Sequence, residues 1–134
     1  MSSALVVVGT IFLAIAAVIH VFIFVLESVM WSRPSAWRGF GVRSQGDADV
    51  IHPMAFNQGF YNLFLALGIG IGLVLAAWPN LHQAGHGIAL FAAGSMVAAA
   101  VVLIISSPKL ARAAAIQGVA PLVGIALLSL GLAA

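Results

Sequence analysis

The chain has 134 residues, the length of about one domain, yet 63% of them are hydrophobic and only 6% are charged. A soluble globular domain has about a quarter of its residues charged, so this composition excludes an ordinary soluble protein and predicts one that sits in a lipid bilayer. The net charge of +2 comes from five basic and three acidic residues, too few for a surface that binds nucleic acid. The chain has no cysteine, which excludes disulfides, thiolate nucleophiles and cysteine-bound metals.

Four apolar stretches are long enough to cross the hydrocarbon core of a bilayer, which takes about 20 residues. They are residues 5–30, 55–77, 86–106 and 113–132. Because open sheets are unstable in lipid, we expect each stretch to be a helix. The first stretch has no basic residue before it and is far longer than the apolar part of a signal peptide, so we expect it to stay as an anchor. The sequence thus predicts an all-α fold, an integral membrane four-helix bundle forming one domain over residues 1–134.

The basic residues predict the orientation, because positively charged loops stay on the cytoplasmic side of a membrane. All five lie in the two loops of residues 31–54 and 107–112: Arg33, Arg38, Arg43, Lys109 and Arg112. We therefore expect a multi-pass protein of the cell (inner) membrane, with both loops cytoplasmic and both termini extracytoplasmic. Tryptophans at span ends are typical of the membrane interfaces, and Trp31, Trp37 and Trp78 stand at such positions.

Small residues are frequent within the spans. Clear cases are Gly68, Gly70, Gly72, Gly118, Gly124 and Gly131. Lipid provides no hydrophobic force between helices, so close backbone contact through small residues is what holds a bundle together. We interpret these glycines as packing positions, and the same faces would allow a homodimer.

Polar side chains in the predicted spans need a reason, because an ionisable group at mid-bilayer costs about 2.5–3.5 kcal/mol. His20 and Glu27 are seven residues apart on the first span, which places them on one face of a helix. The candidates for proton or ligand binding are His20, Glu27, Asn57, Gln58, Tyr61, Asn62 and Gln117. The predicted orientation brings Glu27, residues 57–62 and Gln117 to one depth, with His20 deeper. We therefore expect a polar pocket open to the cytoplasm or the inner leaflet and closed below by His20, Phe22 and Phe24. Phe24, Trp31 and Pro121 are expected in its wall.

Structural interpretations of the same residues stay open. Glu27 could instead reach the membrane interface and pair with Arg33 or Arg38. The amides could serve as hydrogen-bonding contacts between helices.

The remaining histidines give a weaker signal. His82 and His86 have the i, i+4 spacing that suits a metal, but two ligands without a nearby carboxylate are a weak indication. Haem would need a second histidine at the depth of His20 in another span, and none is present. We therefore expect neither a metal nor a cofactor.

Several motifs carry a resemblance to a known family. They are HVFIFVLE of residues 20–27 followed by Trp31, FGV of residues 40–42, NQGFYNLFLALG of residues 57–68, and QGVAPLVGIAL of residues 117–127. With these motifs the chain resembles a family of small bacterial four-span membrane proteins catalogued as domain of unknown function 1304. The resemblance implies the four-span fold and points to the same polar positions, but it brings no activity.

Three functions are consistent with these residues. The first is binding or transport of a small amphipathic or cationic molecule, with Glu27 exchanging a proton for the ligand. The second is an intramembrane enzyme acting on a lipid or an isoprenoid, with Glu27 as acid or base and His20 as its relay. The third is a structural or accessory membrane subunit whose polar residues only fix the register of the helices. The absence of a visible nucleophile or metal set favours the first.

Overall fold

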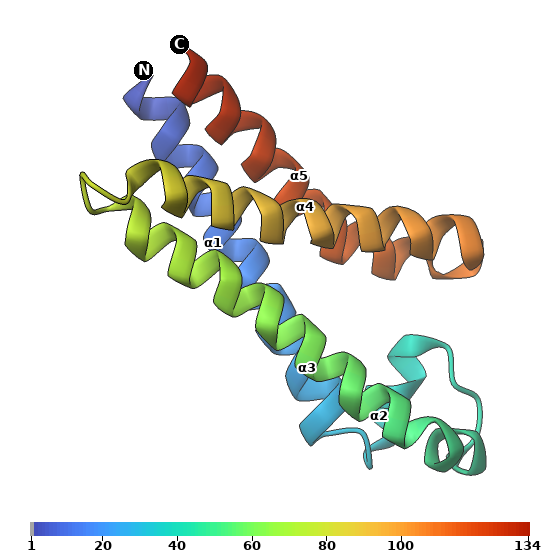
Figure 1. The fold of residues 1–134 in the computed structure, drawn as a ribbon. Helices are drawn as coiled ribbons and strands as arrows, with labels where there is room; N and C mark the ends of the chain where they lie inside the picture. The colour runs from blue at the N-terminus through green and yellow to red at the C-terminus, as the bar shows by residue number, and fades with distance from the viewer. Residues whose placement is uncertain (1) are drawn as a thin grey trace.

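The computed structural model describes residues 2–134, and helices make up nearly all of it (Figure 1). The long helices are α1 (Ser3–Phe24), α3 (Gln45–Ala76), α4 (His82–Ser106) and α5 (Ala111–Ala133). The short ones are the π-helical turn η1 (Val25–Val29), α2 (Pro34–Trp37) and the 3-10 turns η2 (Arg38–Phe40) and η3 (Pro108–Leu110).

Four segments are long and apolar enough to cross a membrane. They are Ser3–Val29, Gln45–Ala76, His82–Ser106 and Pro108–Ala133. Residues 2–134 contain no strand. The structure therefore confirms the predicted all-α fold with four helices of membrane-crossing length.

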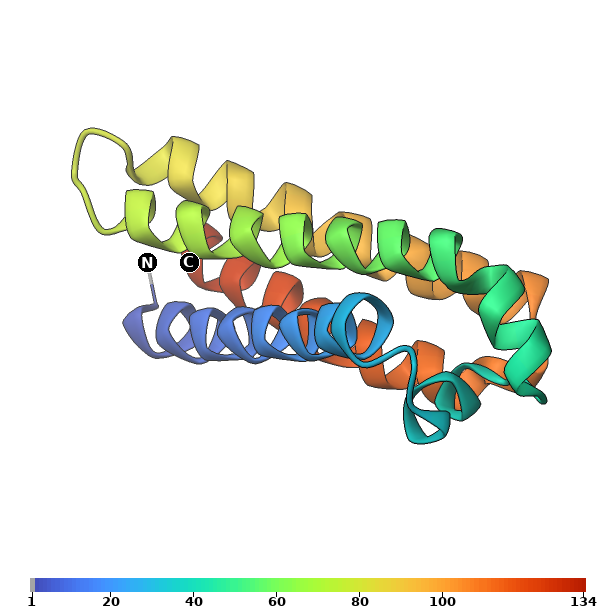
Figure 2. The ribbon, with the colours of Figure 1, turned by 90° about the horizontal axis from the view of Figure 1, so that it is seen from below.

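The four long helices pack in a ring, in which α1 contacts α3 and α5, and α4 contacts the same two helices (Figures 1 and 2). Toward the end of the molecule that carries the N- and C-termini, α1 lies against α5 and α3 lies against α4 (Figure 1). Toward the other end, α3 separates from α4 and α5, so that the molecule has two arms (Figure 1). The connection between α1 and α3 lies at this open end.

Small residues set the contact between α1 and α5. A Cβ atom added at Gly9 would lie 2.5 Å from the backbone nitrogen of Leu128, and one at Gly124 would lie 2.6 Å from Cδ2 of Leu13. Leu13 and Leu128 are fully buried in the main apolar core, so the two helices are in direct backbone-to-side-chain contact there. Such close approach is the usual basis of helix association in lipid.

The contact between α3 and α4 has the same origin. A Cβ atom at Gly72 would lie 2.6 Å from the backbone nitrogen of Ala89 and 2.7 Å from the carbonyl oxygen of Gly85. Gly72 thus has the packing role expected for the glycines of the second span. Gly70 differs, because a side chain there would meet no atom within 4 Å.

Helix α3 begins ten residues before the predicted span of residues 55–77. Ser44 caps it, since its hydroxyl oxygen accepts a hydrogen bond of 3.1 Å from the backbone nitrogen of Asp47. With 32 residues the helix is about 48 Å long, which exceeds a hydrocarbon core of about 30 Å. Its first turns therefore extend beyond the apolar part of the chain and include Pro53.

The tryptophans near α2 are buried in protein, contrary to the interfacial positions that we expected. Trp31 and Trp37 are 5% and 2% exposed, and they form a second apolar cluster with Ala48 and Ala55 of α3. The Trp31 Nε1 donates a hydrogen bond of 2.9 Å to the Ala48 carbonyl oxygen. The extension of α3 provides the surface against which they pack. Trp78, at the other end of α3, is exposed as an interfacial residue should be.

We predict that Gly9→Ala destabilises the bundle by about 1–3 kcal/mol, because the new methyl group overlaps the backbone of Leu128. Gly87→Ala is the matched control, since a side chain there meets nothing within 4 Å and alanine favours a helix. Unfolding of both variants by sodium dodecyl sulfate in mild detergent measures the difference. Equal stability of the two variants would contradict the packing described for α1 and α5.

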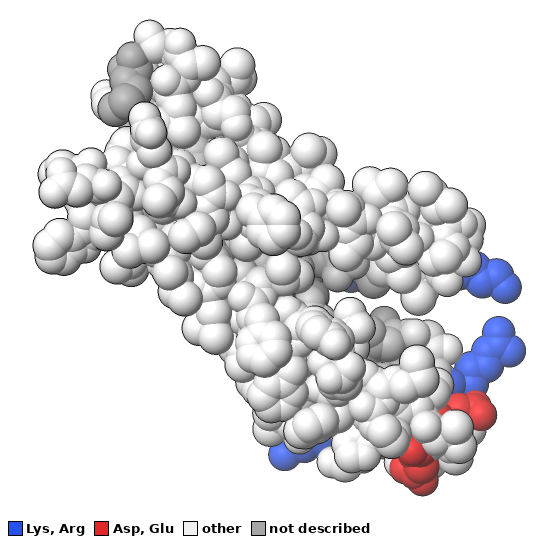
Figure 3. Space-filling view, viewed as in Figure 1, with Lys and Arg blue, Asp and Glu red and all other residues white. Residues whose placement is uncertain are grey.

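The charged side chains visible in Figure 3 lie at the end of the molecule away from both termini. The chain has no cysteine, so single cysteines can report which side of a membrane each end faces. We predict that Gln83→Cys, in the first turn of α4 and near the termini, reacts with a membrane-impermeant maleimide on intact cells. Ser35→Cys, in the basic loop, should react only after the cells are opened; the reverse pattern would refute the predicted orientation.

Candidate functional site

A pocket of about 650 Å³ lies between the two arms, where all four long helices contribute to its wall. Figure 3 shows the molecule hollowed between these arms. The wall is mostly apolar, with Ile23 of α1, Leu26 of η1, Leu65 of α3 and Val102 of α4 among its members. Six of the predicted polar residues also line it: His20, Glu27, Gln58, Tyr61, Asn62 and Gln117. Residues far apart in the sequence are thus brought together in one pocket.

Glu27 lies in the π-helical turn η1, where the Met30 nitrogen donates to the Val25 carbonyl oxygen at 2.8 Å. Its side chain is 7% exposed. Its Oε2 accepts a hydrogen bond of 2.9 Å from Asn62 Nδ2 of α3. Across residues 2–134 no ion pair joins it to Arg33 or Arg38, so the interfacial pairing considered for this residue is absent. A π-helical turn inside an α-helix often occurs at a functional site.

Gly59 and Ser28 hold this turn against α3. The Ser28 hydroxyl donates a hydrogen bond of 2.8 Å to the Phe56 carbonyl oxygen. A Cβ atom at Gly59 would overlap the Ser28 Oγ and lie 3.1 Å from the Glu27 Cβ. Neither residue was a candidate from the sequence, although Gly59 belongs to the NQG motif. Only a glycine permits η1 to lie this close to α3.

Asn62 uses both hydrogens of its amide nitrogen within the protein. One goes to Glu27 Oε2, and the other goes to the Gln58 carbonyl oxygen at 3.1 Å. Both partners accept hydrogen bonds there, so they fix the orientation of the amide. The Asn62 Oδ1 has no donor among residues 2–134.

His20 is 2% exposed and forms one hydrogen bond, of 2.9 Å, between its Nδ1 and the Ala16 carbonyl oxygen. A carbonyl oxygen can only accept, so Nδ1 carries the hydrogen. In the neutral imidazole the other nitrogen, Nε2, is then an acceptor. It has no partner among the described residues, and His20 lines the pocket.

The remaining predicted residues lie outside the pocket lining. Asn57 is exposed on α3, because five residues of helix turn it well away from Asn62. Phe24 packs edge-on against Phe60, with ring centroids 5.1 Å apart, and Trp31 belongs to the apolar cluster near α2. Pro121 is buried in α5, on the same stripe as Gly124, which packs against α1. Phe22 lines the pocket as expected, and Phe40 lines it as well.

The rim of the pocket is formed by Gly39 and Phe40 from the α1–α3 connection and by Leu110 from η3. Basic residues flank these positions in the sequence, and all four are exposed: Arg38, Arg43, Lys109 and Arg112. Figure 3 shows Lys and Arg side chains on both arms beside the opening. The pocket therefore opens at the charged end of the molecule.

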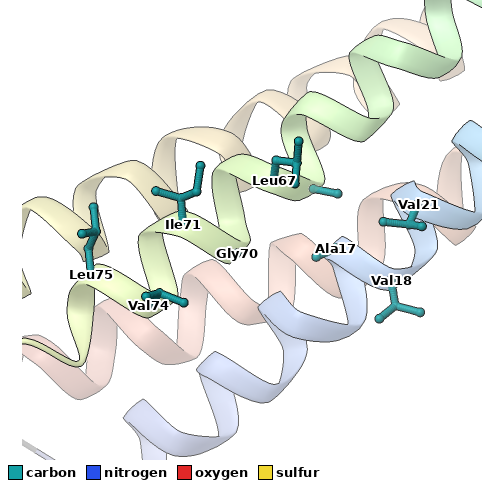
Figure 4. A pocket seen from close by; sticks show the side chains of 9 residues that line it. Ala17, Val18, Val21, Leu67, Gly70, Ile71, Val74 and Leu75 are labelled. Carbon is teal, nitrogen blue, oxygen red and sulfur yellow. The ribbon is translucent and has the colours of Figure 1, made fainter.

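A second depression, of about 560 Å³, lies between α1 and α3 on the outside of the bundle (Figure 4). Its lining contains no polar side chain: Ala17, Val18, Val21, Ala66, Leu67, Gly70, Ile71, Val74 and Leu75. Gly70 leaves this groove open, since no side chain fills the space above it. Such a surface suits contact with apolar chains, and its lining has no side chain that could act as an acid, a base or a hydrogen-bond partner.

His82 and His86 lie at the opposite end of the molecule from the pocket. Their rings are 4.3 Å apart between centroids, and the Ala76 carbonyl oxygen lies 2.6 Å from His82 Nδ1. No group of three or more potential metal ligands from histidine, aspartate, glutamate and cysteine is present within residues 2–134.

The comparisons with known proteins give a family and no activity. A family model described as a protein of unknown function (DUF1304) matches residues 14–129. This range contains every polar residue of the pocket described above. No curated protein and no solved structure matches the chain.

We predict that Asn62→Ala lowers the stability of the folded protein by about 1–3 kcal/mol, because it leaves a buried carboxyl oxygen without its donor. Asn57→Ala is the matched control, since the same change on the exposed face of the same helix removes none of the hydrogen bonds described. Thermal unfolding in detergent compares the two. A similar loss in both variants would contradict a specific role for the contact between Asn62 and Glu27.

Proposed function

We propose that this chain, which belongs to the DUF1304 family of proteins of unknown function, binds a small amphipathic or cationic molecule in the pocket between its arms. Glu27 is the residue that recognises the polar end of the ligand and exchanges a proton for it. Movement of the ligand across the membrane is the further step that such an exchange would drive.

The Glu27 carboxyl carries this proposal. It is buried within a membrane-crossing segment, and Asn62 is its one hydrogen-bond donor among residues 2–134. An ionised carboxylate in such surroundings is costly unless an opposite charge pairs with it. A cationic or donor-bearing ligand that enters the pocket would supply that partner.

The rest of the pocket supports an amphipathic ligand. A volume of about 650 Å³ is typical of pockets that hold small organic molecules. The wall beside Glu27 is apolar, with Ile23 and Leu26 on one side and Leu65 on the other, so an apolar body can pack there. The polar residues are few and gathered, which is the pattern that orients a ligand.

Proton exchange follows from the chemistry of a single carboxyl. Asn62 occupies Oε2, so a proton and a ligand would compete for Oε1. Binding of either one then displaces the other. Transport would additionally require an opening toward the end where the termini lie and where α1 now packs on α5 and α3 on α4.

We predict that Glu27→Gln weakens binding of dodecylamine about tenfold or more, because the variant removes the negative charge that pairs with the ammonium. For the natural protein the affinity should fall as the pH drops from about 8 to about 5, since protons compete with the ligand for the carboxylate. The variant should lose this dependence. Equilibrium binding to protein in lipid nanodiscs measures both effects.

Two controls define this experiment. Empty nanodiscs report how much amine simply dissolves in the lipid, and Asn57→Ala should bind as the natural protein does, because Asn57 does not line the pocket. Equal affinity and equal pH dependence for the natural protein and Glu27→Gln would overturn the proposal. If no ligand bound and Glu27→Gln only lowered stability, a structural role would explain the residue better.

A further inference from the structure

We propose that the polar end of the ligand is an amine that carries N–H hydrogens, and that a quaternary ammonium of the same charge and size binds poorly. This inference rests on the proposed function and names the class of ligand for that pocket. It follows from which hydrogen-bonding atoms the protein leaves free around Glu27.

Three residues in the pocket are buried and polar, and the two that carry donors, His20 and Asn62, use them within the protein. His20 Nδ1 bonds to the Ala16 carbonyl oxygen, and the two hydrogens of Asn62 Nδ2 go to Glu27 Oε2 and the Gln58 carbonyl oxygen. With Glu27 ionised, the atoms that remain are Glu27 Oε1, His20 Nε2 and Asn62 Oδ1. All three are acceptors.

The backbone fixes this arrangement. The Ala16 and Gln58 carbonyl oxygens lie on the helices themselves and can only accept, so neither the imidazole tautomer nor the amide can reverse without losing a buried hydrogen bond. The buried part of the pocket therefore requires donors from its ligand. A protonated primary amine supplies three N–H hydrogens on a positive charge, and Glu27 Oε1 with Asn62 Oδ1 beside it are the acceptors that one such group can meet. His20 lies seven residues, about 10 Å of helix, from Glu27.

A quaternary ammonium would satisfy the charge and leave these acceptors unpaired. A buried acceptor that loses water and gains no donor weakens binding, and sites built to hydrogen-bond a ligand group reject analogues that lack it. If charge alone determined the affinity, the protein would bind the amine and the quaternary ammonium equally well. The preference between them therefore separates hydrogen bonding from simple electrostatic attraction.

The other polar and charged groups around the pocket lie nearer its rim or on another part of its wall. Tyr61 and Gln58 line it from α3, and Gln117 lines it from α5. Arg38, Lys109 and Arg112 flank the rim from η2, η3 and α5 and are exposed. None of these basic side chains forms an ion pair with Glu27 in the described part of the chain. An amine would thus find its one acidic partner at Glu27.

The test compares dodecylamine with dodecyltrimethylammonium, which share the apolar chain and the positive charge. We expect the natural protein in nanodiscs to bind the amine about tenfold or more tightly than the quaternary compound. Glu27→Gln should reduce that ratio, because Asn62 Nδ2 would donate to the amide oxygen and leave the NH2 group facing the ligand, whereas His86→Phe, at the far end of the molecule, should leave it unchanged. Thermal unfolding of each variant confirms that it is folded.

The outcomes are distinguishable. Equal affinity for both compounds, with both lost in Glu27→Gln, would overturn this inference and leave the proposed function standing. Tighter binding of the quaternary compound would overturn the inference as well. Failure of the natural protein to bind either compound would overturn both. The comparison of the two compounds needs no variant, so a variant that fails to fold does not prevent a decision.

Discussion

A lipid bilayer offers no hydrogen-bond partner, and this constraint shapes each polar contact of the pocket. Ser28, Asn62 and His20 all bond to carbonyl oxygens of the helix backbone, and Asn62 also bonds to Glu27. These bonds hold the side chains in place and at the same time use up their donors. Among residues 2–134 no basic side chain forms an ion pair with the Glu27 carboxyl, and this is the observation on which the proposed binding of a ligand or a proton rests.

Close contact between helices at glycine positions is the second feature on which the fold depends. Gly9, Gly72 and Gly124 let the helices touch at the end that carries the termini, where α1 meets α5 and α3 meets α4. At the other end the arms diverge and larger side chains line the space between them. The pocket thus forms because the distance between the helices increases along the bundle, from close backbone contact at the glycines to open separation between the arms. The fold and the site are consequences of the same helix-to-helix distances.

The sequence predicted much of this arrangement, because a segment that crosses lipid must be long and apolar and a polar residue within it stands out. Long apolar runs identify the four helices, and polar residues that have a cost in lipid, such as His20, Glu27 and Gln117, do line one pocket. What the sequence did not predict depends on local geometry. The extension of α3 to Gln45 covers Trp31 and buries it, and the π-helical turn has no marker in residue periodicity. Phe24 was expected in the wall because it shares a helix face with His20, but its ring packs against Phe60 of α3.

The π-helical turn η1 also separates two registers along the first membrane-crossing segment. Its wider i→i+5 bonding accommodates an extra residue relative to the helix before it. Residues upstream, such as Gly9 and Leu13, keep the rotation that fits α5, while Ser28 and Trp31 downstream take the rotation that fits α3. The downstream part can therefore pack on α3 without changing the rotation with which the upstream part packs on α5. Glu27 sits at the junction, so its direction is set by both contacts together and a length change of one residue there would turn it away.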